Sequence, residues 1–229
     1  KYLGGHAAAM GGVIVDAGRF DYGAEPGRFP GFTEPDESYN GTVFSRDLGV
    51  DGPFGTNLSY ILKARVQLLR DYGSAISPFN AFLLNLGLET LSLRVRQHVA
   101  NAAAVAAFLQ AHPQVDSVVY PGLESSPWYE AARRYLTEGA GGIVSFRIVG
   151  GREAGAAFVD ALRLHHHVAN VGDVRSLVIH PASTTHSQLS DQEQRRAGVD
   201  PGLVRLSVGL EDVADILADL AHGFEAAAR

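Results

Sequence analysis

The chain has 229 residues, 46% of them hydrophobic and 19% charged, which is enough for one large domain or two small ones. The net charge of −6 offers no basic patch for nucleic acid or an anionic membrane, and no apolar run reaches the length of a membrane span. No cysteine is present, which excludes disulfides and thiolate chemistry and agrees with a reducing, cytoplasmic compartment.

The N-terminal stretch KYLGGHAAAMGGVIVDAG is rich in small residues, and we predict a buried strand at Val13–Val15. Taken alone, Lys1 is most simply a solvated chain end. The stretch starts without methionine and has no apolar signal-peptide segment, so we expect further residues upstream and no signal peptide.

Residues 19–52 combine glycine, proline, aromatic and acidic residues without a clear period. A connection of this length without an element of its own is uncommon, and it is usually functional or ordered by a partner. Its aromatic residues predict that it packs, although a surface loop at a subunit contact remains the alternative. These residues are Phe20, Tyr22, Phe29, Phe32, Tyr39 and Phe44.

Residues 56–73 have the spacing of an amphipathic helix that ends at Gly73. Ser77 and Pro78 then predict a cap and a first-turn proline, followed by a long helical stretch that ends before Pro113. Gly87 inside this stretch predicts a bend. We place a domain boundary near Ser77.

Beyond Pro113 the pattern alternates between strands and helices, which indicates an α/β or α+β domain. The expected order is a strand in 115–122, a helix in 126–139, a strand in 141–150 and a helix in 152–165. The chain ends on an amphipathic helix in 211–229, whose apolar side carries Val213, Ile216, Leu217, Leu220 and Phe224.

The segment 168–211 carries most of the information. An apolar piece ends at a Gly172-Asp173 turn, and a polar connection and a short charged segment (190–197) follow. In VRLSVG the apolar residues alternate with Arg205 and Ser207, which predicts a half-buried strand with these two side chains on its polar face.

Arg205 has two interpretations. A long side chain can bury its stem and keep its charge in water. Alternatively, its planar fork can face a pocket and bind a carboxylate with two hydrogen bonds. The sequence of this strand alone favours the first interpretation.

Other polar residues predict structural roles. His165, His166 and His167 cannot converge on one ion, because neighbours on a strand face opposite ways, so we expect surface or interface residues and no metal site. We expect hydrogen bonds within the fold for His180 and His186. Asp173 is expected to cap its turn. Glu211 is expected to cap or start the last helix.

The motifs ANVGD, SLVIHPASTTH and VRLSVGLE occur here in an order and spacing that resemble the C-terminal signature of the pyridoxal-phosphate enzymes of cysteine and methionine metabolism. KYLGGH and SPFNAFLL…GLETLSLR extend the resemblance over most of the chain. It implies an α/β fold in two parts. Residues 1–76 would end a large PLP-binding domain of the aspartate aminotransferase type (fold type I). Residues 77–229, with the long connecting helix, would form a smaller C-terminal α/β domain with a mostly antiparallel sheet.

The resemblance also implies site residues. The motif around Lys1 is similar to the one whose lysine forms a Schiff base with pyridoxal 5′-phosphate and acts in catalysis. Arg205 matches the arginine that binds the substrate α-carboxylate, and Asn170 matches a residue that helps to hold it. Ala7 departs from the usual GGHGTT pattern. The phosphate-binding loop, the ring-stacking aromatic and the acid that pairs the ring nitrogen are expected upstream, some of them from a neighbouring subunit.

Within the family, three features resemble the O-acetylhomoserine sulfhydrylase branch: Asn170, RFPGFTEPDESY and YPGLESSP. This branch implies a γ-replacement in methionine biosynthesis, in which O-acetyl-L-homoserine and sulfide give L-homocysteine and acetate. A homotetramer with active sites shared between subunits is expected, without nucleic-acid or membrane partners. Cystathionine γ-synthase, a γ-lyase and O-succinylhomoserine sulfhydrylase remain alternatives, as does a non-enzymatic module if the upstream half is truly absent.

Overall fold

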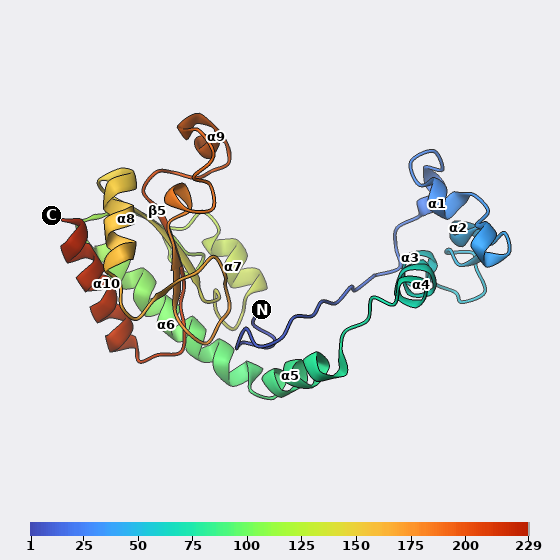
Figure 1. Cartoon of the computed structure of the whole chain (residues 1–229), viewed down its shortest axis with the longest axis horizontal. Helices are drawn as coiled ribbons and strands as arrows, with labels where there is room; N and C mark the ends of the chain where they lie inside the picture. Colours follow the sequence, from blue (N-terminus) through green and yellow to red (C-terminus); the bar gives the residue numbers. More distant parts are fainter. Residues whose placement is uncertain (229) are drawn as a thin grey trace. The chain divides into compact units, whose positions relative to one another are not determined.

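The computed structural model describes residues 1–228 and consists of two compact units (Figure 1). The sheet unit comprises Lys1–Ala9 and Phe82–Arg229, and the helical unit comprises Met10–Ala81. The domain boundary near residue 77 concerns the larger enzyme and stays a prediction. No helix within residues 1–228 has the length and apolar character to cross a membrane.

The sheet unit contains one five-stranded sheet with the strand order β1-β2-β5-β4-β3. Every neighbouring pair is antiparallel except β3 and β4, which are parallel. The strands are β1 (Val115–Val119), β2 (Ile143–Ile148), β3 (His166–His167), β4 (Leu177–Ile179) and β5 (Leu203–Ser207). The predicted α/β class is therefore confirmed.

Strand β4 lies in a segment that we predicted to be a polar connection, and that prediction was wrong. All three residues of β4 are buried, and they pair with β5 on one side and β3 on the other. Three consecutive apolar residues are too few to show an alternation, so the pattern before His180 gave no strand signal.

Residues 181–183 and 191–196, which we predicted as part of a polar connection and as a short charged segment, form short helices, and the other helices of this part of the chain follow the predicted order. The helices are α5 (Pro78–Glu89), α6 (Leu91–Ala111), α7 (Tyr129–Tyr135), α8 (Gly151–Ala161), η4 (Pro181–Ser183), α9 (Asp191–Arg196) and α10 (Val213–Ala227). The Ser77 hydroxyl accepts the Asn80 N–H, so the predicted cap of α5 is confirmed. The long helical stretch breaks at Thr90, three residues after Gly87, and ends before Pro113 as predicted.

The core of the sheet unit lies between one face of the sheet and helices α6, α8 and α10 (Figure 1). Val204, Leu206 and Val208 are fully buried on this face, which confirms the alternation predicted for β5. Three phenylalanines from β2, α8 and α10 pack together, with centroid distances of 5.4 and 4.7 Å from the ring of Phe158 to Phe146 and Phe224. Arg205 and Ser207 consequently belong to the opposite face of the sheet.

Helix α10 begins one residue later than we predicted for its cap. The carboxylate of Asp212 accepts the Ala214 N–H and caps the helix. Glu211 instead accepts hydrogen bonds from the N–H and the hydroxyl of Ser176, at 2.7 and 2.9 Å. The shorter side chain of Asp212 suits the cap, whereas the longer one of Glu211 reaches the loop before β4.

The helical unit contains η1 (Tyr22–Ala24), α1 (Pro30–Thr33), η2 (Glu37–Tyr39), α2 (Phe44–Asp47), α3 (Ser59–Lys63), the π-helical segment η3 (Ala64–Leu69) and α4 (Arg70–Tyr72). The last three form one helical run that ends at Gly73, with φ of 70°, as predicted. The prediction that 19–52 is a connection without an element of its own was wrong, because η1, α1, η2 and α2 lie in it. Its aromatic residues do pack as predicted: Tyr22 stacks on Phe32 with a centroid distance of 4.2 Å.

The buried strand predicted at Val13–Val15 is wrong for this structure. These residues form no strand, and their side chains are 76%, 59% and 88% exposed. A strand needs a neighbour for its N–H and C=O groups, and among residues 1–228 none pairs with this segment.

Candidate functional site

Lys1 begins a turn that is tied to the loop before β4. The Gly5 N–H donates to the Lys1 carbonyl at 2.9 Å, and the Gly5 carbonyl accepts the Val174 N–H at 2.8 Å. Gly5 has a φ of 74°, a conformation that favours glycine. The Lys1 side chain is exposed, and within residues 1–228 its amine has no hydrogen bond or ion pair.

The buried guanidinium of Arg94, from α6, meets this turn from the other side. It donates to the carbonyls of Tyr2 and Leu3 at 2.9 and 3.1 Å. The same side chain reaches the Gly87 carbonyl and the Thr90 hydroxyl, at 2.6 and 3.1 Å. The peptide groups that follow Lys1 are therefore fixed by a side chain that comes more than ninety residues later.

The ring of Tyr2 fills a space that two glycines leave open. A Cβ atom at Gly172 would lie 2.9 Å from the Tyr2 ring, and one at Gly142 would lie 2.7 Å from its hydroxyl. On a third side the ring meets His98 edge to face, with centroids 5.1 Å apart. Burial raises the pKa of the Tyr2 hydroxyl and lowers that of His98.

The turn at 170–175 links this corner to strand β5. The Gly172 N–H donates to the Ser207 hydroxyl at 2.9 Å. The Asp173 carboxylate accepts the N–H and Nε of Arg175 at 3.0 and 2.9 Å, which confirms its predicted capping role. Burial alone would raise the pKa of Asp173, but the hydrogen bonds and charge of Arg175 hold that pKa below its usual range.

Arg205 lies in the middle of the sheet, on the face away from the core. Its neighbours across the ladder are Ser145 on β2 and Ile179 on β4. The side chain is half-buried, and within residues 1–228 it has no hydrogen bond or ion pair. It shares its face with Ser207, about 7 Å along the strand. Arg205 is thus a guanidinium fork that the described part of the protein leaves unoccupied.

Lys1, Asn170 and Arg205 are connected through a few contacts and short stretches of chain within the sheet unit. Lys1 is followed by Tyr2, whose ring packs on Gly172. Gly172 bonds Ser207, two residues from Arg205 on β5, and Asn170 lies two residues before Gly172. The Asn170 side chain is half-buried and, like the other two, makes no hydrogen bond within residues 1–228.

These uncommitted groups fit a carbonyl cofactor and an amino-acid substrate. A primary amine is the side-chain group that forms a Schiff base with an aldehyde. A guanidinium fork matches a carboxylate, and an amide adds a further donor. Among residues 1–228 no cluster of three or more His, Asp or Glu side chains is placed to hold a metal ion.

The histidines have structural roles, and one prediction about them was wrong. His166 and His167 are exposed as expected, but His165 is only 5% exposed. Its Nδ1 lies 2.7 Å from the carboxylate of Asp219 on α10, and both side chains are buried. Burial alone would raise the pKa of Asp219, yet hydrogen bonds from the His165 ring and from backbone N–H groups hold that pKa well below its usual range.

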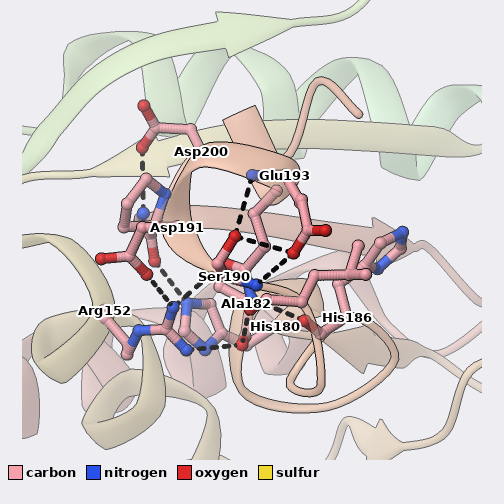
Figure 2. A network of polar contacts seen from close by, with 12 residues as sticks. Arg152, His180, Ala182, His186, Ser190, Asp191, Glu193 and Asp200 are labelled. Atoms are coloured by element: carbon pink, nitrogen blue, oxygen red, sulfur yellow. Dashed lines mark hydrogen bonds and ion pairs between the residues drawn. The ribbon is translucent and has the colours of Figure 1, made fainter. Parts of the chain in front are cut away.

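His180 forms the hydrogen bonds within the fold that we predicted. Its Nδ1 lies 2.8 Å from the Ser183 hydroxyl, and its Nε2 lies 2.7 Å from the Pro201 carbonyl. Beside it, Arg152 donates to the Ala182 carbonyl and the Asp191 carboxylate at 2.6 and 2.9 Å (Figure 2). This network fixes the STTH loop and α9 against α8.

Sequence reasoning missed Arg94 and the contact between Ser207 and Gly172. Arg94 stands in the SLR part of a recognised motif, but its partners are main-chain carbonyls, which leave no trace in a residue pattern. The polar face of β5 did single out Ser207, without indicating its partner.

Comparison with known proteins gives consistent results. The family model "Cys/Met metabolism PLP-dependent enzyme" matches residues 1–225. An O-acetyl-L-homoserine sulfhydrylase from Leptospira meyeri is 54% identical over 222 residues, which cover 96% of this chain and 50% of that protein. A homocysteine synthase from Schizosaccharomyces pombe is 48% identical over 227 residues, which cover 99% of this chain and 51% of that protein.

A solved structure agrees with the fold. It is described as an O-acetylhomoserine (thiol)-lyase from Campylobacter jejuni and carries an N′-pyridoxyl-lysine-5′-monophosphate. The match has a TM-score of 0.83 and 37% identity, and it covers 98% of this chain and 52% of the other. The chain thus spans about half the length of the relatives it matches. By its family match over nearly its whole length, the chain belongs to the Cys/Met metabolism PLP-dependent enzymes.

Proposed function

We propose that this chain is part of an O-acetylhomoserine sulfhydrylase, which converts O-acetyl-L-homoserine and sulfide into L-homocysteine and acetate. One observation carries the proposal. The backbone of Lys1 is anchored beside a turn that is hydrogen-bonded to β5, the strand that presents the half-buried Arg205, and within residues 1–228 the Lys1 amine and the Arg205 guanidinium have no partner. The names of the relatives support the choice of substrate within the family.

The three residues would divide two roles, holding the cofactor and binding the substrate. Lys1 would hold pyridoxal 5′-phosphate covalently through Nζ, and Arg205 and Asn170 would bind the α-carboxylate of the amino acid. When bound, pyridoxal phosphate supplies an electron sink for carbanion chemistry. As a free amine, Nζ of Lys1 would carry protons between the substrate carbons as a general acid and base. The carboxylate clamp would keep the substrate oriented during these transfers.

We also propose a domain assignment and an assembly. Residues 1–76 would be the end of a large PLP-binding domain of the aspartate aminotransferase type, and residues 77–229 the smaller C-terminal domain. A homotetramer in the cytoplasm with shared active sites is part of the same proposal. The exposed apolar side chains of Val13, Ile14 and Val15 support it, because such a patch is usually covered by another part of an assembly.

The test uses the full-length protein with O-acetylhomoserine, with and without sulfide, and identifies the amino-acid product. We expect homocysteine and acetate only when sulfide is present. 2-Oxobutyrate and ammonia as main products would show a γ-lyase, and a higher rate with O-succinylhomoserine would show the succinyl-specific alternative. Cystathionine formed from added cysteine in preference to homocysteine would show a γ-synthase.

The matched variant is Lys1→Ala in the same full-length protein. We expect loss of turnover and loss of the visible absorption of the bound cofactor, because alanine has no amine with which to form the covalent link. Full activity and unchanged absorption in Lys1→Ala would disprove the role of Lys1 whatever the substrate proves to be.

A further inference from the structure

We propose that Arg94 is a positioning residue for the reaction, because its guanidinium fixes the direction in which the Lys1 side chain leaves the backbone. The inference rests on the proposed function, in which Lys1 holds the cofactor. Arg94 itself touches neither substrate nor cofactor in this account. It acts through the peptide groups whose carbonyls belong to Tyr2 and Leu3, in the turn that Lys1 begins.

The contacts of Arg94 use the whole guanidinium group. Nη1 donates to the Tyr2 carbonyl, and Nη2 donates to the carbonyls of Leu3 and Gly87. Nε donates to the Thr90 hydroxyl at 3.1 Å. A planar fork with five donors can bind several acceptors in one fixed plane, which a lysine ammonium cannot reproduce.

The surroundings of Arg94 are built for this contact. Arg94 is only 6% exposed, and no acidic side chain within residues 1–228 forms an ion pair with it. A Cβ atom at Gly5 would lie 2.2 Å from Nη1, and one at Gly87 would lie 2.5 Å from the Gly4 carbonyl. The turn and the helix thus approach each other only because these positions lack side chains.

Burying a cation that meets only neutral acceptors costs free energy. A hydrophobic contact could attach a chain segment at a lower cost. What the guanidinium adds is directional restraint. The lysine side chain has many rotamers, so the orientation of its amine can be defined at the backbone only if the adjoining peptide planes are fixed. The Gly5 N–H holds the Lys1 carbonyl, in the peptide plane that adjoins the Lys1 Cα, and Arg94 holds the next two peptide planes of the same turn.

The experiment compares full-length Arg94→Ala, Arg94→Lys and Arg96→Ala holoenzymes with the parent protein. Arg96 is the matched control, because it is exposed on the same helix and has no partner within residues 1–228. Four quantities are measured: the adduct on the Lys1 peptide after borohydride reduction, the absorption of the bound cofactor against pH, kcat and KM for O-acetylhomoserine, and the recovery of kcat by added guanidinium chloride at non-denaturing concentration.

For Arg94→Ala we expect kcat to fall about a hundredfold, the cost of displacing a catalytic group by about 1 Å. KM should stay near the parent value because Arg205 and Asn170 are untouched. The pH at which the absorption of the bound cofactor changes should differ from that of the parent protein. Added guanidinium chloride should restore part of kcat. Arg94→Lys should fold and lose kcat in the same way, whereas Arg96→Ala should match the parent protein.

An Arg94→Ala protein that is folded and behaves like Arg96→Ala would overturn the inference. So would a fall in kcat with an unmoved absorption profile and no recovery by guanidinium, because that pattern indicates general loosening. If Arg94→Ala does not fold, parent-like kcat and absorption in Arg94→Lys would overturn it instead. A parent protein with no borohydride adduct on Lys1 would disprove the proposed role of Lys1, and this failure is visible before any Arg94 variant is compared.

Discussion

Among single residues, Arg205 makes the sharpest statement about binding, because its guanidinium is half-buried and unpaired within residues 1–228. Arg205→Lys in the full-length enzyme keeps the charge but loses the planar fork. Loss of one charge-assisted bond is worth about 1.5–3 kcal/mol, so we expect kcat/KM for O-acetylhomoserine to fall about ten- to a hundredfold, chiefly through KM.

Steady-state kinetics on Arg205→Lys and on a control, Arg147→Lys, checks this prediction. Arg147 lies on the neighbouring strand and the same sheet face, but it is paired with Asp116 and Asp200. Its replacement should leave KM unchanged. Equal kinetic constants for the two variants would show that Arg205 does not bind the carboxylate.

Asp219 gives a prediction about stability and pH. Its buried carboxylate accepts hydrogen bonds from the His165 ring and from the N–H groups of Arg163 and His165, and these bonds lower its pKa. A depressed carboxyl pKa stabilises the fold above the unfolded pKa of about 3.9, and that contribution is lost as the pH falls through the folded pKa. Asp219→Asn should therefore lower the free energy of unfolding by about 3 kcal/mol near neutral pH, and by less as the pH falls below about 4.

Denaturant unfolding of the two proteins at a series of pH values measures this difference. Asp215→Asn is the control, because Asp215 is exposed one turn earlier on α10. A difference between Asp219→Asn and the parent that stays constant down to the lowest pH would contradict a role for the ionised carboxylate.

Residue roles could be predicted only where a motif or a local rule carries them. The cap of Asp173 followed from its turn and is confirmed, whereas the roles of Lys1, Asn170 and Arg205 follow from the resemblance and stay predictions. The prediction that His165 lies at a surface or interface was wrong, because strand alternation tells which way a side chain points and not how deeply it is buried. Its partner Asp219 is 54 residues away.

At the level of elements, α9 is a short helix with a capping box at its N-terminus. Ser190 and Glu193 form this capping box, in which the side chain of each residue accepts a hydrogen bond from the backbone N–H of the other. Ser190→Ala should lower the free energy of unfolding by about 1 kcal/mol. Ser187→Ala, an exposed serine in the same loop, is the control for thermal or denaturant unfolding. Equal stability of the two variants would mean that α9 does not contribute to the cooperative unit.

The helix ends at Ser77 and Gly73 could be predicted, for a physical reason. The caps at Ser77 and Gly73 act within one turn of the chain, so the sequence contains them. A strand is completed by partners elsewhere. Leu177–Ile179 became strand β4 because β5 and β3 lie beside it, whereas Val13–Val15 has apolar residues but no pairing strand within residues 1–228.

For the whole molecule, the α/β class could be read from the alternation of elements, but the two compact units could not. The unit division places the first nine residues with the C-terminal sheet. That placement depends on contacts such as those from Val174 and Arg94, which join residues about ninety to a hundred and seventy positions apart. A boundary search along the sequence has no means of finding such contacts.

The proposed cofactor also gives a prediction for the whole full-length protein. A group that binds only the folded state stabilises it, by about 2.7 kcal/mol at a hundredfold excess over its Kd. Removing the cofactor should therefore lower the Tm, and adding pyridoxal phosphate should restore it. In Lys1→Ala the restoring shift should be smaller because the covalent link is lost. Differential scanning calorimetry with and without cofactor measures both shifts, and equal shifts in the two proteins would contradict a covalent link through Lys1.

The turn after Lys1 has a consequence for which substitutions the protein can accept. Arg94 binds carbonyl groups at positions 2 and 3, which every amino acid has, and the Leu3 side chain is 47% exposed. Position 5 is different, because its φ of 74° favours glycine and a Cβ atom there would lie 2.2 Å from Nη1 of Arg94. In a library randomised over these positions and selected for growth without methionine, residue 3 should accept many amino acids while residue 5 returns to glycine.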